Sequence, residues 1–324
     1  MSTADAPFAV LDGADLDQVA AQLQAQRFFW LDVHNPKPDQ LSRLGELMHL
    51  HPLTIADVST FSERPKRESF GDYISLVVYG VDQEVAEGEQ LLREVHLLIS
   101  GDWVVTFHPT PFSVLDDLRG RVRAGPARRQ QQLIFEILDT VMQSYVPVLD
   151  RVDDSIDEIE QSVIEGPSEH SLQRIFSLKR DLISMRRVVT PMRDFFARDA
   201  EEITHLPRME HEDTLYFRDV YDTLVRTSEL VDSYRDLLSG ATDMYLSTVA
   251  NRQGEVSKQL TIIATIFLPL TFLTGFFGQN FAFLTGHIQN STWSFFALGL
   301  GLLVVSIIGF AVYFRRKGWL GSTQ

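Results

Sequence analysis

The sequence QLTIIATIFLPLTFLTGFFG, residues 259–278, contains no charged side chain. A second uncharged stretch, WSFFALGLGLLVVSIIGFAVYF, occupies residues 293–314. A helix needs about 20 apolar residues to cross the hydrocarbon core of a bilayer, and both stretches are long enough. The sequence therefore predicts transmembrane helix 1 at 259–278 and transmembrane helix 2 at 293–314, joined by a loop at 279–292.

The charges around these spans predict their orientation. The basic residues that flank them are Arg252 and Lys258 before the first span, and Arg315, Arg316 and Lys317 after the second. The loop 279–292 contains no Lys, Arg, Asp or Glu. Because basic flanks tend to stay in the cytoplasm, we expect a multi-pass protein of the cytoplasmic (inner) membrane, with both termini cytoplasmic, an external loop and a basic cytoplasmic tail at 315–324.

The composition excludes several classes of protein. The chain has 324 residues and a formal net charge of -15, which argues against nucleic acid as a partner. It has no cysteine, so disulfides and thiolate sites are excluded. The N-terminal MSTADAPFAV lacks the features of a signal peptide. No GxxxxGK, HExxH or GxSxG motif occurs, so we predict neither an enzyme nor a bound cofactor.

The segment before the spans predicts an α+β domain followed by helices. Four β-rich stretches, at 28–33, 72–80, 91–99 and 102–108, are accompanied by helical patterns near 38–48 and 111–123. We assign 1–128 to a cytoplasmic α/β domain and 129–206 to an acidic helical hairpin region that breaks near Gly166 and Pro167. A stalk helix is assigned to 207–258.

The stalk shows a heptad-like pattern. Residues spaced three and four apart are Phe217, Val220, Leu224, Thr227, Val231, Tyr234, Leu238, Ala241, Tyr245 and Thr248. No proline occurs between Arg208 and Leu268. This pattern predicts one continuous helix over 208–278 with a buried seam.

The same spacing continues into the first span as a stripe of small and hydroxyl-bearing residues. Its members are Gly254, Ser257, Thr261, Ala264, Leu268, Thr271, Gly275 and Gly278. Such a stripe suits a pore-lining helix, and it also suits close packing between helices. One hairpin cannot enclose a pore, so the pore interpretation requires a cyclic oligomer.

The amides Gln279 and Asn280 follow the first span directly. In a cyclic oligomer they would repeat as a ring at the outer mouth, where amide oxygens can accept hydrogen bonds from the water shell of a cation. Mg²⁺ gives up its water reluctantly, so such a ring suits the hydrated ion. The alternative is that this segment only ends a membrane anchor.

The segment LTIIATIFLPLTFLTGFFGQNF, 260–281, resembles the first transmembrane helix and Gly-Met-Asn signature of CorA-type divalent-cation transporters, a family that includes the ZntB group. HPLTIADV (51–58), RPKRESFGDYISLVV (64–78), YFRDVYD (216–222) and LLSGATDMYLS (237–247) are also similar to family segments. The resemblance implies a homopentamer in the lipid bilayer, with a cytoplasmic α+β funnel, a long pore-lining stalk helix and a C-terminal two-helix transmembrane hairpin.

The resemblance also implies roles for individual residues. Gly278, Gln279 and Asn280 correspond to the selectivity filter, with Asn280 as the ligand of a hydrated cation. Asp243 corresponds to an acid near the cytoplasmic end of the pore. Asp219 corresponds to half of a regulatory metal site between subunits, and its partner is either Asp82 or Glu84.

The sequence departs from the family pattern in ways that bear on selectivity. Gln279 replaces the usual Met, Gly254 and Ser257 replace the usual Asn and Met, and the loop lacks the common acidic stretch, leaving only His287 titratable. We predict passive or gradient-driven transport of Mg²⁺, Co²⁺, Ni²⁺ or Zn²⁺, with Mg²⁺ or Zn²⁺ also as a candidate regulatory ion. The alternative is a transport-deficient relative that acts as a membrane scaffold or regulatory protein.

Overall fold

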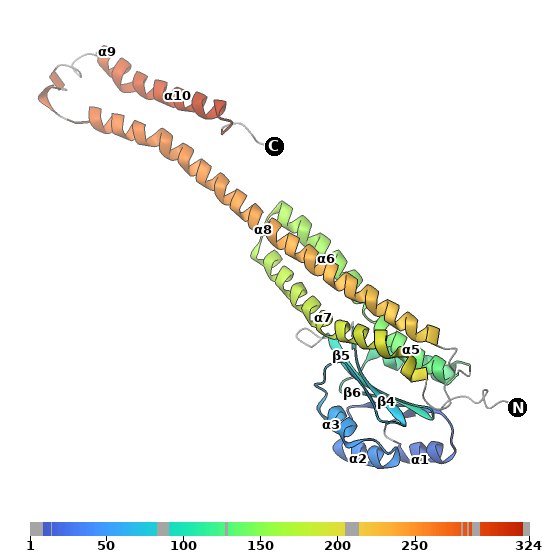
Figure 1. The fold of residues 1–324 in the computed structure, drawn as a ribbon. Helices are drawn as coiled ribbons and strands as arrows, with labels where there is room; N and C mark the ends of the chain where they lie inside the picture. The colour runs from blue at the N-terminus through green and yellow to red at the C-terminus, as the bar shows by residue number, and fades with distance from the viewer. Residues whose placement is uncertain are drawn as a thin grey trace. The chain divides into compact units, whose positions relative to one another are not determined.

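The computed structural model describes residues 9–13, 15–82, 91–126, 129–204, 214–279, 281–283, 285–286 and 292–319 (Figure 1). The chain divides into two compact units, Met1–Thr242 and Asp243–Gln324. Glu84 and Asn280, two of the predicted site residues, lie outside the described residues.

A six-stranded mixed sheet forms the centre of the first unit. Its strands are β1 (Ala9–Asp12), β2 (Phe29–His34), β3 (Lys66–Ser69), β4 (Tyr73–Val81), β5 (Leu92–Ser100) and β6 (Trp103–His108). The strand order is β1-β2-β6-β5-β4-β3. β1, β2 and β6 run parallel, whereas β6, β5, β4 and β3 pair antiparallel. The four predicted β-rich stretches correspond to β2, β4, β5 and β6, and the short edge strands β1 and β3 were not predicted.

Helices cover both faces of this sheet, so its central strands are apolar and buried on both sides. On one face lie α1 (Leu16–Gln24), α2 (Pro38–Leu47) and α3 (Pro52–Thr60), and on the other lie α5 (Gln130–Gln143) and α7 (Glu169–Thr204) (Figure 1). α4 (Ser113–Ala124) contacts β1 and α5. Phe29 and Phe107, both inaccessible to solvent, belong to the core beneath α1–α3.

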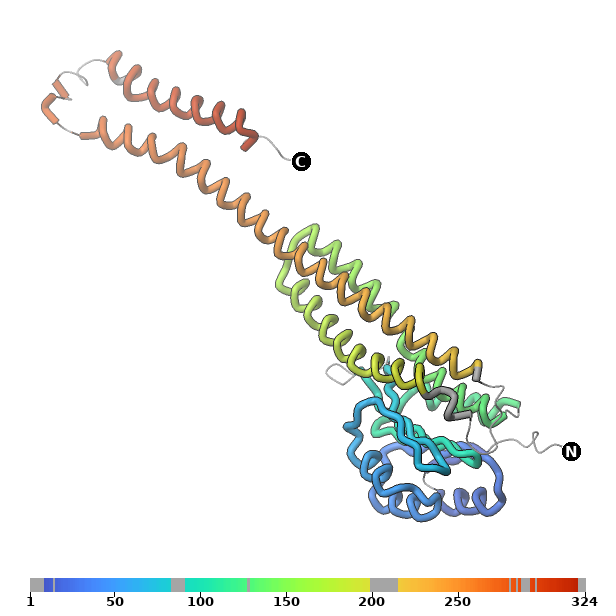
Figure 2. Tube along the Cα trace, in the orientation of Figure 1, coloured from blue at the N-terminus to red at the C-terminus, as the bar shows by residue number. Residues whose placement is uncertain are grey.

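The helical part of the first unit contains α6 (Val146–Glu165), α7 and the beginning of α8 (Thr214–Phe277), which lie side by side (Figure 2). α6 and α7 are separated at Gly166 and Pro167, as predicted. The predicted seam of α8 is buried from Phe217 to Ala241. Across these helices Arg186 pairs with Asp232 at 2.9 Å, and Arg193 donates to the Ser228 hydroxyl at 3.2 Å.

The second unit contains the rest of α8, the short α9 (Thr292–Ser294), a π-helical segment (Phe295–Gly301) and α10 (Leu302–Arg316). Two helical stretches, Leu215–Phe277 and Thr292–Arg316, are long and apolar enough to cross a membrane. The continuous helix predicted before and through the first span is present from Thr214 to Phe277 as α8, with one internal proline, Pro269, and residues 208–213 of the prediction lie outside the described residues. The observed elements agree with an α+β domain, a long helix and a C-terminal apolar hairpin.

Candidate ion pathway and regulatory residues

The predicted pore-lining stripe lies on an exposed surface of α8. Its small members Gly254, Ser257, Thr261, Thr271 and Gly275 are all exposed in the single chain. The bulky residues of the same helix are exposed as well, with Leu268 73% and Phe272 68% accessible. One chain therefore covers neither the small stripe nor the bulky faces of this helix.

The threonine hydroxyls of the stripe already donate their hydrogens to the helix. Thr261 Oγ1 donates to the carbonyl oxygen of Ser257 at 2.8 Å, and Thr271 Oγ1 donates to that of Phe267 at 2.9 Å. A hydroxyl has one hydrogen and two acceptor lone pairs. The oxygens of Thr261 and Thr271 can therefore still accept hydrogen bonds. The water molecules around a cation point their hydrogens outward and need acceptors of this kind.

The predicted filter begins where α8 ends. Phe277 is the last helical residue, the Gly278 amide still donates to the Thr274 carbonyl at 2.9 Å, and the Gln279 amide donates to Phe276 at 3.3 Å. A Cβ at Gly278 would lie 3.0 Å from the Thr274 carbonyl oxygen, so a side chain there would crowd the helix end. The Gln279 side chain is exposed.

Asp243, assigned to the pore entrance, and Asp219, assigned to the regulatory site, are both exposed on α8. Burial and then the nearby charge of Asp219 raise the pKa of Asp139 on α5, with a hydrogen bond from Gln143 acting in the opposite direction. Asp219 therefore faces another acid of its own chain.

Asp82 is 5% exposed and its carboxylate has protein partners. The Arg93 Nε lies 3.4 Å from Asp82 Oδ2, and the Ser113 hydroxyl donates to Asp82 Oδ1 at 3.1 Å. A metal ion at Asp82 would have to displace the Arg93 guanidinium. Within the described part of the chain, no group of three or more His, Asp or Glu side chains is placed to hold a metal ion.

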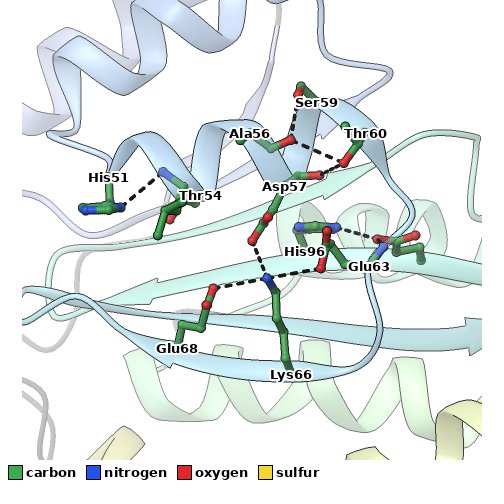
Figure 3. Close-up of polar contacts among 12 residues, drawn as sticks. His51, Thr54, Ala56, Asp57, Ser59, Thr60, Glu63, Lys66, Glu68 and His96 are labelled. Atoms are coloured by element: carbon green, nitrogen blue, oxygen red, sulfur yellow. Dashed lines mark hydrogen bonds and ion pairs between the residues drawn. The ribbon is translucent and has the colours of Figure 1, made fainter.

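One polar cluster that sequence reasoning missed surrounds Lys66 on the edge strand β3 (Figure 3). Its ammonium lies 2.7 Å from Asp57 Oδ2, 3.2 Å from Glu63 Oε2 and 3.5 Å from Glu68 Oε2. Partial burial acts to lower the pKa of Lys66, but these carboxylates raise it above its usual value. The cluster joins α3 to β3 and to the segment between them. Such mixed charges look like a solvated surface in sequence, and only the fold brings them together.

Glu94 extends this cluster into the sheet. Its Oε1 accepts from His96 Nε2 at 2.7 Å and from the Glu63 amide at 3.1 Å, and its Oε2 lies 2.9 Å from the Tyr79 hydroxyl. The bond to the Glu63 amide ties the segment after α3 to β5. The contacts of this cluster join groups of one domain, so the arrangement positions α3 and β3.

A second missed cluster is buried between β2, β6 and α4. Asp32 is 1% exposed, and its carboxylate accepts from Thr106 Oγ1 at 2.5 Å, His108 Nε2 at 3.2 Å and Arg119 Nη1 at 3.1 Å. His108 Nδ1 donates to the Thr110 carbonyl at 2.6 Å. Both ring nitrogens of His108 are thus donors, as in an imidazolium.

The charges in this cluster shift each other's pKa. Burial alone would raise the pKa of Asp32, but the hydrogen bond and charge of His108, with Thr106 and Arg119, hold it below its usual value. Burial would lower the pKa of His108, but Asp32, the Thr110 carbonyl and Asp116 raise it. The sequence did contain a signal: Thr106 and His108 are two apart in a predicted strand, so they share one face.

Comparison with known proteins identifies the family. The family model described as "CorA-like Mg2+ transporter protein" matches residues 25–316. The chain belongs to the CorA-like family. The CorA-like family is one of transporters and not of enzymes.

Relatives cover most of this CorA-like chain. The cobalt/magnesium transport protein CorA of Thermotoga maritima is 33% identical over 90% of this chain and 83% of its own length. The zinc transport protein ZntB of Yersinia enterocolitica is 27% identical over 91% of this chain and 89% of its own length. The structure of the CorA magnesium transporter of Methanocaldococcus jannaschii is similar in fold, with a TM-score of 0.78, 23% identity and coverage of 91% of this chain and 92% of that one.

Proposed function

We propose that this chain transports divalent metal cations across the cytoplasmic membrane through a pore formed by five copies. The observation that carries the proposal is the stripe on α8, where small residues alternate with threonines whose oxygens remain as acceptors. The relatives named for cobalt and magnesium and for zinc support Mg²⁺, Co²⁺ and Zn²⁺ as the ions, with Ni²⁺ as a further candidate.

The proposed pathway runs from Asp243 through Gly254, Ser257, Thr261, Leu268, Thr271 and Gly275 to Gly278, Gln279 and Asn280. Asn280 would form the outer ring that holds a hydrated cation. Leu268 would be a bulky apolar constriction between the polar turns. Because the loop 279–292 carries no acidic residue, electrostatic attraction of cations from outside is weak, and the ring itself has to select the ion.

Ion flux into liposomes tests the function. Purified full-length protein would be reconstituted with a fluorescent divalent-ion indicator inside the vesicles, and Mg²⁺, Co²⁺, Ni²⁺ and Zn²⁺ would be added outside in turn. Transport predicts protein-dependent flux of at least one ion. A correctly assembled oligomer that passes none of them would favour the alternative, a transport-deficient scaffold or regulatory protein.

The oligomer and the topology can be tested separately. Native mass spectrometry in detergent is expected to give five copies, and a monomer or dimer alone would leave no pore. The chain has no cysteine, so Thr292→Cys adds a single thiol that a membrane-impermeant maleimide should label in intact cells. Ser239→Cys, before the first span, should stay unlabelled until the membrane is opened. The reverse pattern would invert the proposed orientation.

For regulation, we propose that a divalent ion binds Asp219 of one copy together with Asp82 or Glu84 of its neighbour. Binding at Asp82 would compete with Arg93, so such an ion would loosen the contact between Arg93 and Asp82 as it closed the pore. Asp219→Lys should weaken inhibition by cytoplasmic metal, because an ammonium would occupy the site. Asp236→Lys, an equally exposed change on α8, is the matched control, and equal inhibition in both variants would remove Asp219 from the site.

A further inference from the structure

The end of α10 has a defined geometry. Gly318 has a φ of +70°, a left-handed conformation that costs glycine little. The Lys317 amide donates to the Tyr313 carbonyl at 3.0 Å, and the Trp319 amide donates to that of Phe314 at 2.9 Å. These bonds satisfy the last carbonyls of the helix and turn the chain back on itself. Residues 315–319, the α10 terminus, therefore form an ordered cap.

The cap places aromatic rings beside the cations. The Trp319 ring stacks on Phe314 with a centroid distance of 5.7 Å and an interplanar angle of 16°. Lys317 Nζ lies 5.9 Å from the centre of the Tyr313 ring, within reach of a cation–π interaction. Tyr and Trp are the residues that favour the boundary between hydrocarbon and headgroups.

In the part of the chain that the structure describes, the three cations of the α10 terminus have no acidic partner. Among the described residues, no carboxylate lies within ion-pairing distance of Arg315, Arg316 or Lys317, and all three are exposed. Lys258, the cation that precedes the other span, does have such a partner, since its Nζ lies 3.6 Å from Glu255 Oε2. Three adjacent positive charges repel one another, and an anionic ligand would relieve that repulsion.

The position of these charges indicates which anion fits. α10 is uncharged from Leu302 to Phe314, and Arg315 is its first charged residue. In a helix that crosses the bilayer, this change from apolar to charged residues falls at the headgroup level. The phosphates of anionic lipids are the negative groups present at that depth, and basic segments next to a span are attracted to them.

We propose that the α10 terminus binds the headgroup of an anionic phospholipid, with Arg315, Arg316 and Lys317 contacting the phosphate and Tyr313 and Trp319 lying at the hydrocarbon boundary. The binding requires that α10 spans the membrane, and it is independent of whether the pore conducts. The alternative partner for these cations is an acidic surface of the protein itself, since the chain has a net charge of -15.

The test measures which lipids stay bound to the full-length protein. Protein would be exchanged into an equal mixture of phosphatidylglycerol and phosphatidylethanolamine, and the retained lipids would be counted by native mass spectrometry. Electrostatic attraction of three basic residues predicts an enrichment of phosphatidylglycerol of about threefold or more. The triple variant Arg315→Gln/Arg316→Gln/Lys317→Gln should retain the two lipids in nearly the bulk ratio.

Two further variants keep the result interpretable. Lys179→Gln/Arg180→Gln/Arg187→Gln lowers the net charge equally on α7 and should keep the enrichment. Arg315→Lys/Arg316→Lys keeps the charges and should keep it too, which separates loss of charge from loss of assembly if the glutamine variant assembles poorly. No enrichment in the parent protein, unchanged enrichment in the glutamine variant, or equal loss in the α7 variant would overturn the proposal.

Discussion

The two units of the chain place their apolar and polar side chains in opposite surroundings. In the first unit, Leu98 and Val105 are inaccessible to solvent, and the charged Asp32 is buried with three donors around it. In the second unit, Leu268 and Val305 are 73% and 69% exposed, and the hydroxyls of Thr261 and Thr271 donate to carbonyls of their own helix.

The two units therefore differ in where the contacts of their side chains come from. The first unit supplies both halves of its buried contacts from its own chain, so its fold is determined internally. The apolar faces of α8 and α10 need a surrounding that is equally apolar, and the stripe of α8 needs a partner that accepts small and hydroxyl-bearing residues. In the proposed oligomer, lipid and further copies of the chain would meet these two needs.

The largest predicted effect is the loss of stability when the buried charge contacts of Asp32 in the first unit are broken. Asp32→Asn removes the negative charge but leaves His108 and Arg119 beside a neutral amide. Loss of one partner from a buried ion pair costs about 3–5 kcal/mol, and we expect a decrease in the free energy of unfolding near the lower value because Arg119 is 22% exposed. Denaturation of the full-length protein in detergent, followed by circular dichroism, measures it.

Arg174→Gln is the control for this prediction. It breaks the Arg174–Glu158 pair, whose side chains are 34% and 66% exposed, and exposed pairs contribute only about 0–1 kcal/mol. Equal losses in both variants would show that the first unit does not depend on its buried charges more than on its surface.

The second prediction concerns the end of the first span. Asn280→Ala removes the amide oxygens proposed to hold the hydrated cation, so divalent flux should fall at least about tenfold, which corresponds to roughly 1.4 kcal/mol. The oligomer should still assemble. Asn290→Ala makes the same substitution in the same loop and should transport normally. Parental flux in Asn280→Ala would leave only the helix-ending role for this segment.

The sequence predicted the helices and central strands because their signals are local. The seam from Phe217 to Ala241 and the apolar strands are periodic patterns that a single segment carries by itself. The pairing of β2 with both β1 and β6, and the clusters around Lys66 and Asp32, depend on residues far apart in sequence. No local pattern specifies that Arg119 meets Asp32, since a charged residue on an amphipathic helix is usually solvated.

For the candidate site too, local patterns could be predicted from the sequence, and contacts between residues far apart in sequence could not. The stripe on α8 stays a prediction, and it could be made from sequence because helical spacing alone puts its members on one surface. The engagement of Asp82 by Arg93 and Ser113 could not be predicted, since it joins β4, β5 and α4 across the domain. It changes the regulatory proposal from simple binding at Asp82 to competition with Arg93.

The third prediction uses two threonines that differ only in position. Thr271 lies on the stripe and Thr274 lies beside it, and both donate to their own helix, at 2.9 and 3.0 Å. Replacement by Val keeps the shape and removes the hydroxyl. Thr271→Val should lower liposome flux several-fold, because a ring of acceptors is lost from the pore, whereas Thr274→Val should have little effect. The opposite ranking would place the pore on a different face of α8.

The smallest predicted effect is a pH dependence of the stability of the first unit. Because the folded pKa of His108 is raised, its charged contact with Asp32 stabilises the first unit fully below the unfolded pKa of about 6.5 and is lost as pH rises through the folded pKa. The pKa of Asp32 is lowered, so its own contribution is lost only at acidic pH, as pH falls through its folded value. Asp116 and Arg119 are the other charged side chains near the pair.

We therefore expect the unfolding free energy to decrease from pH 6 to pH 9 by less than the Asp32→Asn loss, with the decrease absent in His108→Gln. His34→Gln is the matched control, because His34 stacks on His108 at 5.5 Å but is exposed, and its pH dependence should follow the parent protein. Denaturant titrations at each pH measure the slope. A parent slope retained in His108→Gln would mean that another group titrates, and the buried imidazolium would lose its place as the pH-sensitive contact of the first unit.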